Sequence, residues 1–216
     1  MIAEIKGKIS SSGSNLHDRL EDQLTGDVFG SLRYVPAEDG LLPVLNAAYF
    51  GEQSVDFAPF LQGFVGDKLH FWDRQVESEI DLTIQTENLV VGVEVKLHSG
   101  LSSQDQLERE AETLKNHFFA ERKYLLFVAR KDACKEVYEA HIANGWAEKF
   151  PEITLGYIGW EDVLKAINAR RGQVDVYGRC VLTDIADLLT RKGFGGFVSV
   201  AEGELPPVEK HLYFSF

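Results

Sequence analysis

Three ionisable side chains interrupt two apolar segments near the middle of the chain: Asp81, Glu94 and Lys96. Side chains two positions apart in a strand share a face, so Glu94 and Lys96 are expected to lie side by side. If the two segments form a hairpin whose loop is residues 87–88, Asp81 falls directly opposite Glu94. The Cβ atoms of the two acids would then be about 5 Å apart.

Two carboxylates at that separation repel each other, so that one must be protonated or both must share a cation. A hard divalent ion such as Mg²⁺, with Mn²⁺ as a substitute, prefers oxygen ligands and keeps water molecules for a substrate. Lys96 would place a positive charge beside a metal-bound water. This combination of groups suits metal-assisted hydrolysis of a phosphodiester bond.

The residue pattern predicts the elements that position these side chains. Segment 79–85 alternates apolar and polar residues, which is typical of a half-buried strand, and the valine-rich segment 89–97 is a longer strand. The full prediction is a helix over 16–28 ending near Gly30, a loop-rich stretch at 36–43, strands over 68–76, 79–85 and 89–97, a helix from Ser102 or Ser103 to about 119, a strand over 123–129, a helix over 133–143, a strand over 153–158, and helices over 160–169 and 181–191.

The order of these elements predicts an α/β fold with a mixed sheet flanked by helices. No linker composition divides the chain, so residues 1–216 are expected to form a single domain. Its core would cover about 15–129, and a C-terminal extension of helices and a strand would cover about 130–216.

Asp81 followed by Glu94-Val95-Lys96 resembles the D…E-x-K motif of the PD-(D/E)XK nuclease superfamily, which has a restriction-endonuclease-like fold. The core of that superfamily runs helix, three strands, helix, strand, which is the order predicted over 15–129. The resemblance implies that Asp81 and Glu94 bind Mg²⁺ and that Lys96 assists the attacking water. It also implies a metal-dependent nuclease, acting on DNA rather than RNA.

Two helical positions extend the resemblance. Family members often carry a glutamate on the first helix near the metal, and Glu21 occupies that helix here. Many also carry a Q-x-x-x-Y motif on the helix after the lysine strand; Gln106 matches it, with Glu110 where tyrosine is usual. Glu79-Ile80 stand where a proline usually precedes the first aspartate. The resemblance therefore adds Glu21 to the metal ligands and Gln106 to the supporting residues.

Other interpretations of the same residues remain open. Asp81, Glu94 and Lys96 would also fit a solvated sheet face with a cross-strand ion pair. Glu21 would fit the surface of an amphipathic helix, and Gln106 would fit a helix-capping box with Ser103. The corresponding alternative function is a catalytically inactive nuclease-fold module that binds nucleic acid or a protein partner.

Net charge constrains the partners. The 216 residues include 34 Asp and Glu against 22 Lys and Arg, a formal charge of −12, which disfavours broad contact with a phosphate backbone or an anionic membrane. Binding to DNA would then depend on local basic clusters, or on a protein partner or a second copy of the chain. The candidate clusters are Arg122-Lys123, Arg130-Lys131, Arg170-Arg171 and Arg191-Lys192.

The two cysteines, Cys134 and Cys180, argue against a disulfide scaffold and a multi-cysteine zinc site. The sequence lacks an apolar run of membrane-spanning length, and its first residues do not resemble a signal peptide. The expected location is the cytoplasm, without a membrane partner.

Overall fold

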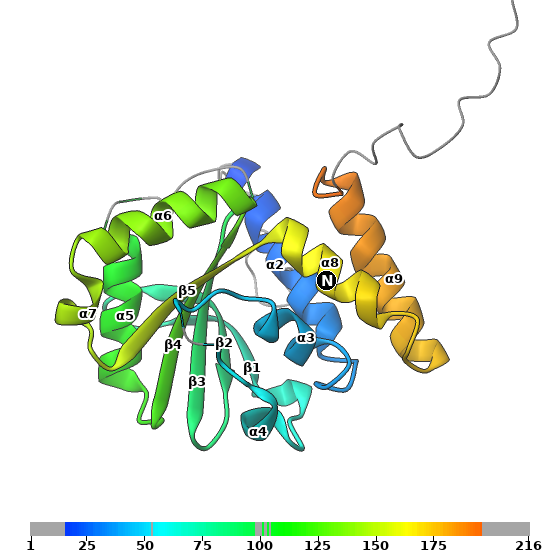
Figure 1. Cartoon of the computed structure of the whole chain (residues 1–216), viewed down its shortest axis with the longest axis horizontal. Helices are drawn as coiled ribbons and strands as arrows, with labels where there is room; N and C mark the ends of the chain where they lie inside the picture. Colours follow the sequence, from blue (N-terminus) through cyan, green and yellow to red (C-terminus); the bar gives the residue numbers. More distant parts are fainter. Residues whose placement is uncertain (1–15, 53, 98–100, 102, 104, 196–216) are drawn as a thin grey trace, which may run out of the picture.

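A five-stranded mixed sheet organises the molecule (Figure 1), as the sequence predicts for an α/β fold. The computed structural model describes residues 16–52, 54–97, 101, 103 and 105–195. The strands are β1 Leu69–Arg74, β2 Glu79–Gln85, β3 Leu89–Val95, β4 Arg122–Ala129 and β5 Ile153–Gly159. They lie in the order β1-β2-β3-β4-β5, antiparallel from β1 to β3 and parallel from β3 to β5.

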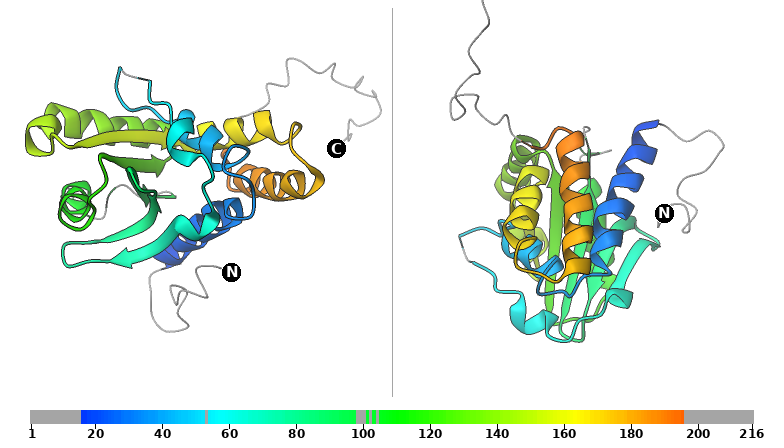
Figure 2. Two further views of the ribbon diagram at one scale, coloured as in Figure 1. Left: turned by 90° about the horizontal axis from the view of Figure 1, so that it is seen from below. Right: turned by 90° about the vertical axis from the view of Figure 1, so that its right-hand side faces the viewer.

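Helices cover both faces of this sheet. They are α2 Leu16–Leu32, α3 Leu41–Asn46, α4 Ala58–Leu61, α5 Gln106–His117, α6 Lys131–Ala143, α7 Trp146–Lys149, α8 Trp160–Arg170 and α9 Val176–Arg191, with a short 3₁₀ turn at Gly66–Lys68. On one face α9 lies between α2 and α8 (Figure 2), and their apolar residues form one core cluster with the sheet. On the other face α5, α6 and α7 enclose a second, smaller core cluster.

Strand β3 is buried along its whole length because helices cover it on both sides. Val91, Val93 and Val95 belong to the larger core cluster, and Val90 belongs to the cluster under α5. Gly92 faces α5, where an added Cβ would lie 3.1 Å from the Leu114 side chain. The missing side chain thus lets α5 approach the middle of the sheet closely.

The predicted hairpin between β2 and β3 is confirmed. Thr86 N–H donates to the Leu89 carbonyl at 2.8 Å, which leaves residues 87–88 as the two-residue loop. Leu82 pairs with Val93, so the register carries Asp81 to the position opposite Glu94. This end of the hairpin is where the two acids meet.

Several predicted boundaries are wrong. Helix α2 continues through Gly30 to Leu32, since Leu32 still contributes to the core. Helix α9 begins at Val176, five residues before its predicted start, where the Asp175 side chain accepts a hydrogen bond from Gly178 N–H. The stretch at 36–43, predicted to be loop, leads into α3, and α4 and α7 were not predicted.

Gly156 in β5 allows the segment at Tyr49 and Phe50 to pack closely against the sheet, and a substitution there tests this packing. At Gly156 a Cβ would lie 2.2 Å from the Phe50 ring and 2.8 Å from the Tyr49 carbonyl. We expect Gly156→Ala to lower the free energy of unfolding by roughly 3 kcal/mol in urea titrations. Gly172→Ala is the matched control, because a Cβ there has no described atom within 4 Å. Equal stability of the two variants would contradict the packing described here.

Candidate functional site

Glu94 and Lys96 form a buried ion pair at the carboxyl end of β3. Lys96 Nζ lies 2.6 Å from Glu94 Oε1, and the residues are 7 % and 1 % exposed, respectively. Ionic groups this deeply buried are uncommon unless they are paired. The interpretation of these two residues as part of a solvated sheet face is therefore wrong.

The backbone of Lys96 is fixed from two sides. Its N–H donates to the Val128 carbonyl of β4 at 2.7 Å, and its own carbonyl accepts the indole N–H of Trp160 at 2.9 Å. Trp160 is fully buried, as expected for a core residue. The first residue of α8 thus holds the lysine at the end of the sheet.

Asp81 lies on β2 and is half-buried. Its Oδ2 accepts the backbone N–H of Val95 at 2.9 Å. The described pairing of β2 with β3 ends at Leu82 and Val93, so beyond this point the Asp81 side chain, rather than a backbone carbonyl of β2, bonds to β3. On the other side, Trp72 of β1 stands at the register position opposite Asp81 with φ of 51°. A bulky residue in the left-handed region is strained, and the strain lies next to the predicted metal ligand.

Glu21 of α2 connects this helix to the end of β3. Its Oε1 accepts the Leu97 N–H at 3.1 Å, and its Oε2 lies 3.6 Å from Lys96 Nζ. The side chain is only 12 % exposed, so its interpretation as an ordinary surface residue is wrong. Glu21 therefore joins the same ion-pair network as Glu94.

Helix α5 supplies Gln106 from the opposite side. The Gln106 amide donates to Glu94 Oε1, the oxygen that also contacts Lys96. The alternative capping box with Ser103 is not formed: α5 is preceded by Asp105, and among the described residues no side chain caps that end. The other predicted cap, Ser102, lies outside the described residues.

Sequence reasoning missed a further acid, Glu110, which lies one turn after Gln106 on α5. It is fully buried, and its carboxyl lies close enough to the Glu94 carboxyl and the Gln106 amide for both to affect its pKa. Among the described residues, however, no donor reaches either oxygen in good hydrogen-bond geometry. A signal was present in the sequence, because Glu110 falls within the apolar stripe of Leu107, Ala111 and Leu114. An acid inside a core-facing stripe indicates a special environment.

Burial and mutual repulsion raise the pKa values of three of these acids. Burial raises the pKa of Asp81 well above its usual range and the charge of Glu94 adds to this; burial likewise raises the pKa of Glu94, with Glu110 as the next cause. Burial raises the pKa of Glu110 to about 8. For Lys96, burial favours the neutral amine, but the attraction of Glu94 outweighs it and raises the pKa, so the group is an ammonium.

These shifts predict a pH dependence of stability. The pKa of Glu110 rises from an ordinary 4.5 when unfolded to about 8 when folded. Between these pH values the unfolded chain loses a proton that the folded chain keeps, so the free energy of unfolding falls as the pH rises and levels off above 8. We expect Glu110→Gln to remove about 5 kcal/mol of this fall in denaturant titrations without divalent cations. Parallel curves for variant and wild type would contradict the expectation.

The chemistry of these groups fits a hard divalent cation. Asp81, Glu94, Glu21 and Glu110 offer carboxylate oxygens, and within the described residues no donor reaches the oxygens of Glu110 in good hydrogen-bond geometry. In the described arrangement no three Asp, Glu, His or Cys side chains lie close enough to hold an ion together. A bound cation would therefore require these side chains to close around it.

The basic clusters lie at different ends of the sheet. Arg130-Lys131 directly follows β4, whose Val128 pairs with Val95, so this cluster lies at the same end as Lys96. The Arg130 guanidinium sits over the Phe194 ring at 5.8 Å, just past the end of α9 that carries Arg191-Lys192. By contrast, Arg122-Lys123 begins β4 at the opposite end.

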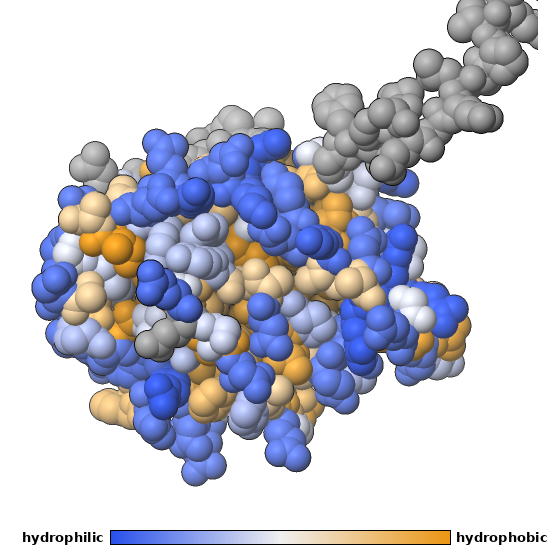
Figure 3. All heavy atoms as spheres, in the orientation of Figure 1, coloured by the Kyte–Doolittle hydropathy of each residue, from blue (hydrophilic) through white to orange (hydrophobic). Residues whose placement is uncertain are grey.

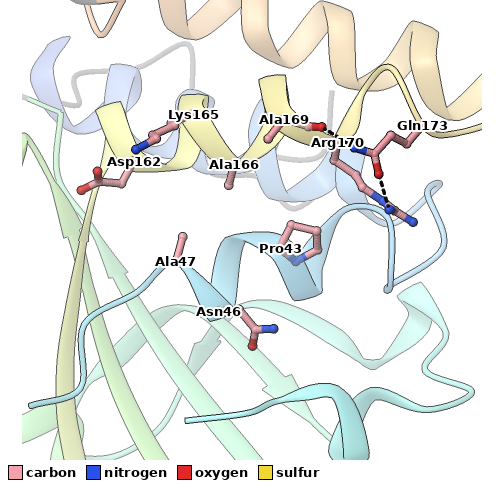
Figure 4. Close-up of a pocket in the computed structure, with 9 residues that line it drawn as sticks. All are labelled: Pro43, Asn46, Ala47, Asp162, Lys165, Ala166, Ala169, Arg170 and Gln173. Carbon is pink, nitrogen blue, oxygen red and sulfur yellow. Dashed lines mark hydrogen bonds between the residues drawn. The ribbon is translucent and has the colours of Figure 1, made fainter. Parts of the chain in front are cut away.

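A hollow of about 520 Å³ lies between α3 and α8 (Figure 4). Its lining is less suited to catalysis than the acid–lysine cluster at the end of the sheet. Pro43, Ala47, Ala166 and Ala169 give it an apolar lining. Arg170 at its rim, part of the candidate cluster Arg170-Arg171, is held by Asp39 and Gln173. The buried carboxylates and the lysine of the sheet end lie elsewhere.

These features define an α/β protein with a five-stranded mixed open sheet flanked by helices and a buried acid–lysine cluster at one sheet end. No protein-family model, curated protein or solved structure matches the chain. None of the helices in the described ranges combines the length and apolar character that crossing a membrane requires.

Proposed function

We propose that this protein is a metal-dependent nuclease of the PD-(D/E)XK type, built on a restriction-endonuclease-like core. The observation that carries the proposal is the meeting of Asp81, Glu94 and Lys96 at one end of the sheet. Three residues separated by up to 15 positions converge there, two of them buried despite their charge. The succession of α2, β1 to β3, α5 and β4, with the short helices α3 and α4 inserted after α2, supports the same proposal.

In this proposal Asp81 and Glu94 hold Mg²⁺ or Mn²⁺, and Glu21 lies close enough to contribute. The bound cation would acidify a water molecule and offset the negative charge that develops on the phosphate. Lys96, whose raised pKa keeps it an ammonium, positions the attacking water and stabilises negative charge rather than accepting a proton. Gln106 fixes the orientation of Glu94 through its amide.

DNA is the proposed substrate class, by analogy with the superfamily. Arg130-Lys131 lies at the same end of the sheet as Lys96, and Arg191-Lys192 ends α9 just before Phe194, over whose ring Arg130 sits. The face drawn in Figure 3 is mainly hydrophilic along α6, which begins at Lys131. Binding would depend on these side chains and on moderate salt, since the total charge of −12 opposes non-specific contact.

One observation favours the alternative of an inactive binding module. The ammonium of Lys96 already occupies Glu94 Oε1, and the described acids do not form a ready three-ligand group. A module that only binds nucleic acid or protein would keep this network as a buried structural ion pair.

A cleavage assay on the whole chain tests the two functions. Linear duplex, circular duplex and single-stranded DNA are incubated with the protein in Mg²⁺, in Mn²⁺ or in EDTA. The proposal expects strand cleavage with a divalent cation and none in EDTA. Intact DNA on all three substrates with both cations would overturn the enzymatic proposal in favour of the binding module.

A further inference from the structure

Glu110 adjoins Glu94 and Gln106, but the network around Lys96 does not supply it with a donor in good hydrogen-bond geometry. Its neighbours on the core-facing side of α5 are Leu107, Ala111 and Leu114, and the residue is fully buried. A glutamate on this face would ordinarily be replaced by an apolar residue, which packs there at no electrostatic cost.

The nearby donors are directed to other acids. Lys96 Nζ contacts Glu94 Oε1 and Glu21 Oε2, and the Gln106 amide also donates to Glu94 Oε1. Within the described residues, no donor reaches either oxygen of Glu110 in good hydrogen-bond geometry, although both oxygens are shielded from solvent. A buried carboxylate in this state costs several kcal/mol unless it is neutralised.

The net charge of the acid cluster indicates what kind of ion would neutralise Glu110. Glu21, Asp81, Glu94 and Glu110 are four carboxyl groups, and Lys96 is the single ammonium that the described structure places among them. If all four were ionised, the cluster would carry three excess negative charges; without a cation, protons on the buried acids offset part of this charge, as their raised pKa values indicate. A divalent cation bound in place of protons would offset two of the three charges. Oxygen ligands from several acids are also what such a cation prefers.

We propose that Glu110 is a third carboxylate ligand, beside Asp81 and Glu94, of the divalent cation. Helix α5 then supplies a metal ligand as well as the amide that orients Glu94. This inference rests on the proposed metal site and adds a ligand that the sequence motif did not indicate. It assigns a role to a buried acid whose oxygens no donor reaches in good geometry within the described part of the chain.

Manganese binding to the whole chain tests the inference without any cleavage assay. The loss of the free Mn²⁺ signal in electron paramagnetic resonance gives the dissociation constant for wild type and variants. We expect Glu110→Gln to weaken Mn²⁺ binding by at least about tenfold, and Glu110→Asp, which keeps the carboxylate, to weaken it less. Glu112→Gln, two residues along α5 and outside the cluster, is the matched control and should bind as wild type does.

The outcomes separate this inference from the proposed function. Wild-type affinity in Glu110→Gln, together with weakened binding in Asp81→Asn, overturns the role of Glu110 and leaves the metal site in place. Wild type that binds no Mn²⁺ at millimolar concentration overturns both. Thermal unfolding adds a second readout: a ligand role predicts that Glu110→Gln shows a smaller Mn²⁺-induced rise in Tm than wild type. An equal rise in the two proteins contradicts it.

Discussion

Lys96→Met is expected to lower the free energy of unfolding by about 3–5 kcal/mol at pH 7 and to reduce DNA cleavage by at least about 10²-fold. Methionine keeps most of the apolar stem of the lysine but leaves Glu94 buried without its cation, while Glu21 loses its 3.6 Å contact. Removing one member of a buried ion pair costs more than the pair itself contributes. Urea titrations and the cleavage assay measure the two effects separately.

The matched control for this variant is Lys149→Met. Lys149 Nζ lies 2.7 Å from Glu108 Oε1, nearly the same separation as in the Lys96–Glu94 pair, but both side chains are substantially exposed. A surface pair of this kind contributes about 0–1 kcal/mol, so the control isolates the effect of burial. Similar losses of stability in both variants would show that the site pair is not special.

The difference in stability between wild type and Lys96→Met should also depend on pH. Because burial raises the pKa of Glu94 above its ordinary value, this carboxylate takes up a proton at a higher pH than an exposed glutamate does, and the buried ammonium of Lys96 then loses the partner that stabilises it. The gap between wild type and Lys96→Met is therefore expected to shrink in acid. A gap that stays constant down to pH 3 would indicate that packing of the lysine stem, rather than its charge, causes the loss.

The parts of the fold that the sequence predicts well are those in which one physical pattern dominates. Alternation in 79–85 predicts β2 to the residue, because Ile80, Leu82 and Ile84 are all buried, although Thr83 of the polar set is buried as well. The two-residue loop fixes the register, and the register in turn predicts that Asp81 and Glu94 meet. These inferences need only local geometry, so a single sequence is sufficient for them.

The features that the sequence did not predict depend on contacts between distant elements. Gly30 reads as a helix stop, yet core packing carries α2 on to Leu32. In the sequence, Glu110 only departs from the Q-x-x-x-Y motif. The close approach of α5 to Gly92 is what shows that this acid is buried beside Glu94. The indole contact of Trp160 with Lys96 spans 64 positions and leaves no local signal.

The location of the site changes what the net negative charge of the chain implies for DNA binding. The formal charge of −12 describes the whole chain, whereas a DNA phosphate would meet only the end of the sheet. That end combines buried acids with the exposed side chain of Arg130 and, near the last turn of α9, Arg191. A cation held by the acids would reduce the local negative charge, so metal and DNA binding are expected to support each other.

Asp81→Asn is expected to reduce cleavage by about 10³-fold while leaving the fold intact. Asparagine keeps the shape of the side chain and an oxygen that can accept the Val95 N–H, so the strand end remains satisfied. Burial and Glu94 raise the pKa of Asp81, which means that its negative charge is unfavourable in the folded protein. Removing that charge should raise stability by roughly 1 kcal/mol at pH 7 without divalent cations.

Loss of activity with a gain in stability would identify Asp81 as a residue kept for its chemistry rather than for folding. The comparison needs Asp81→Ala, which also removes the acceptor for Val95 N–H and should be less stable than Asp81→Asn by about 1–3 kcal/mol. Asp67→Asn, an exposed change outside the site, controls for the loss of one negative charge. Cleavage by Asp81→Asn at the wild-type rate would remove Asp81 from the proposed metal site, because an amide is a far poorer ligand for Mg²⁺ than a carboxylate.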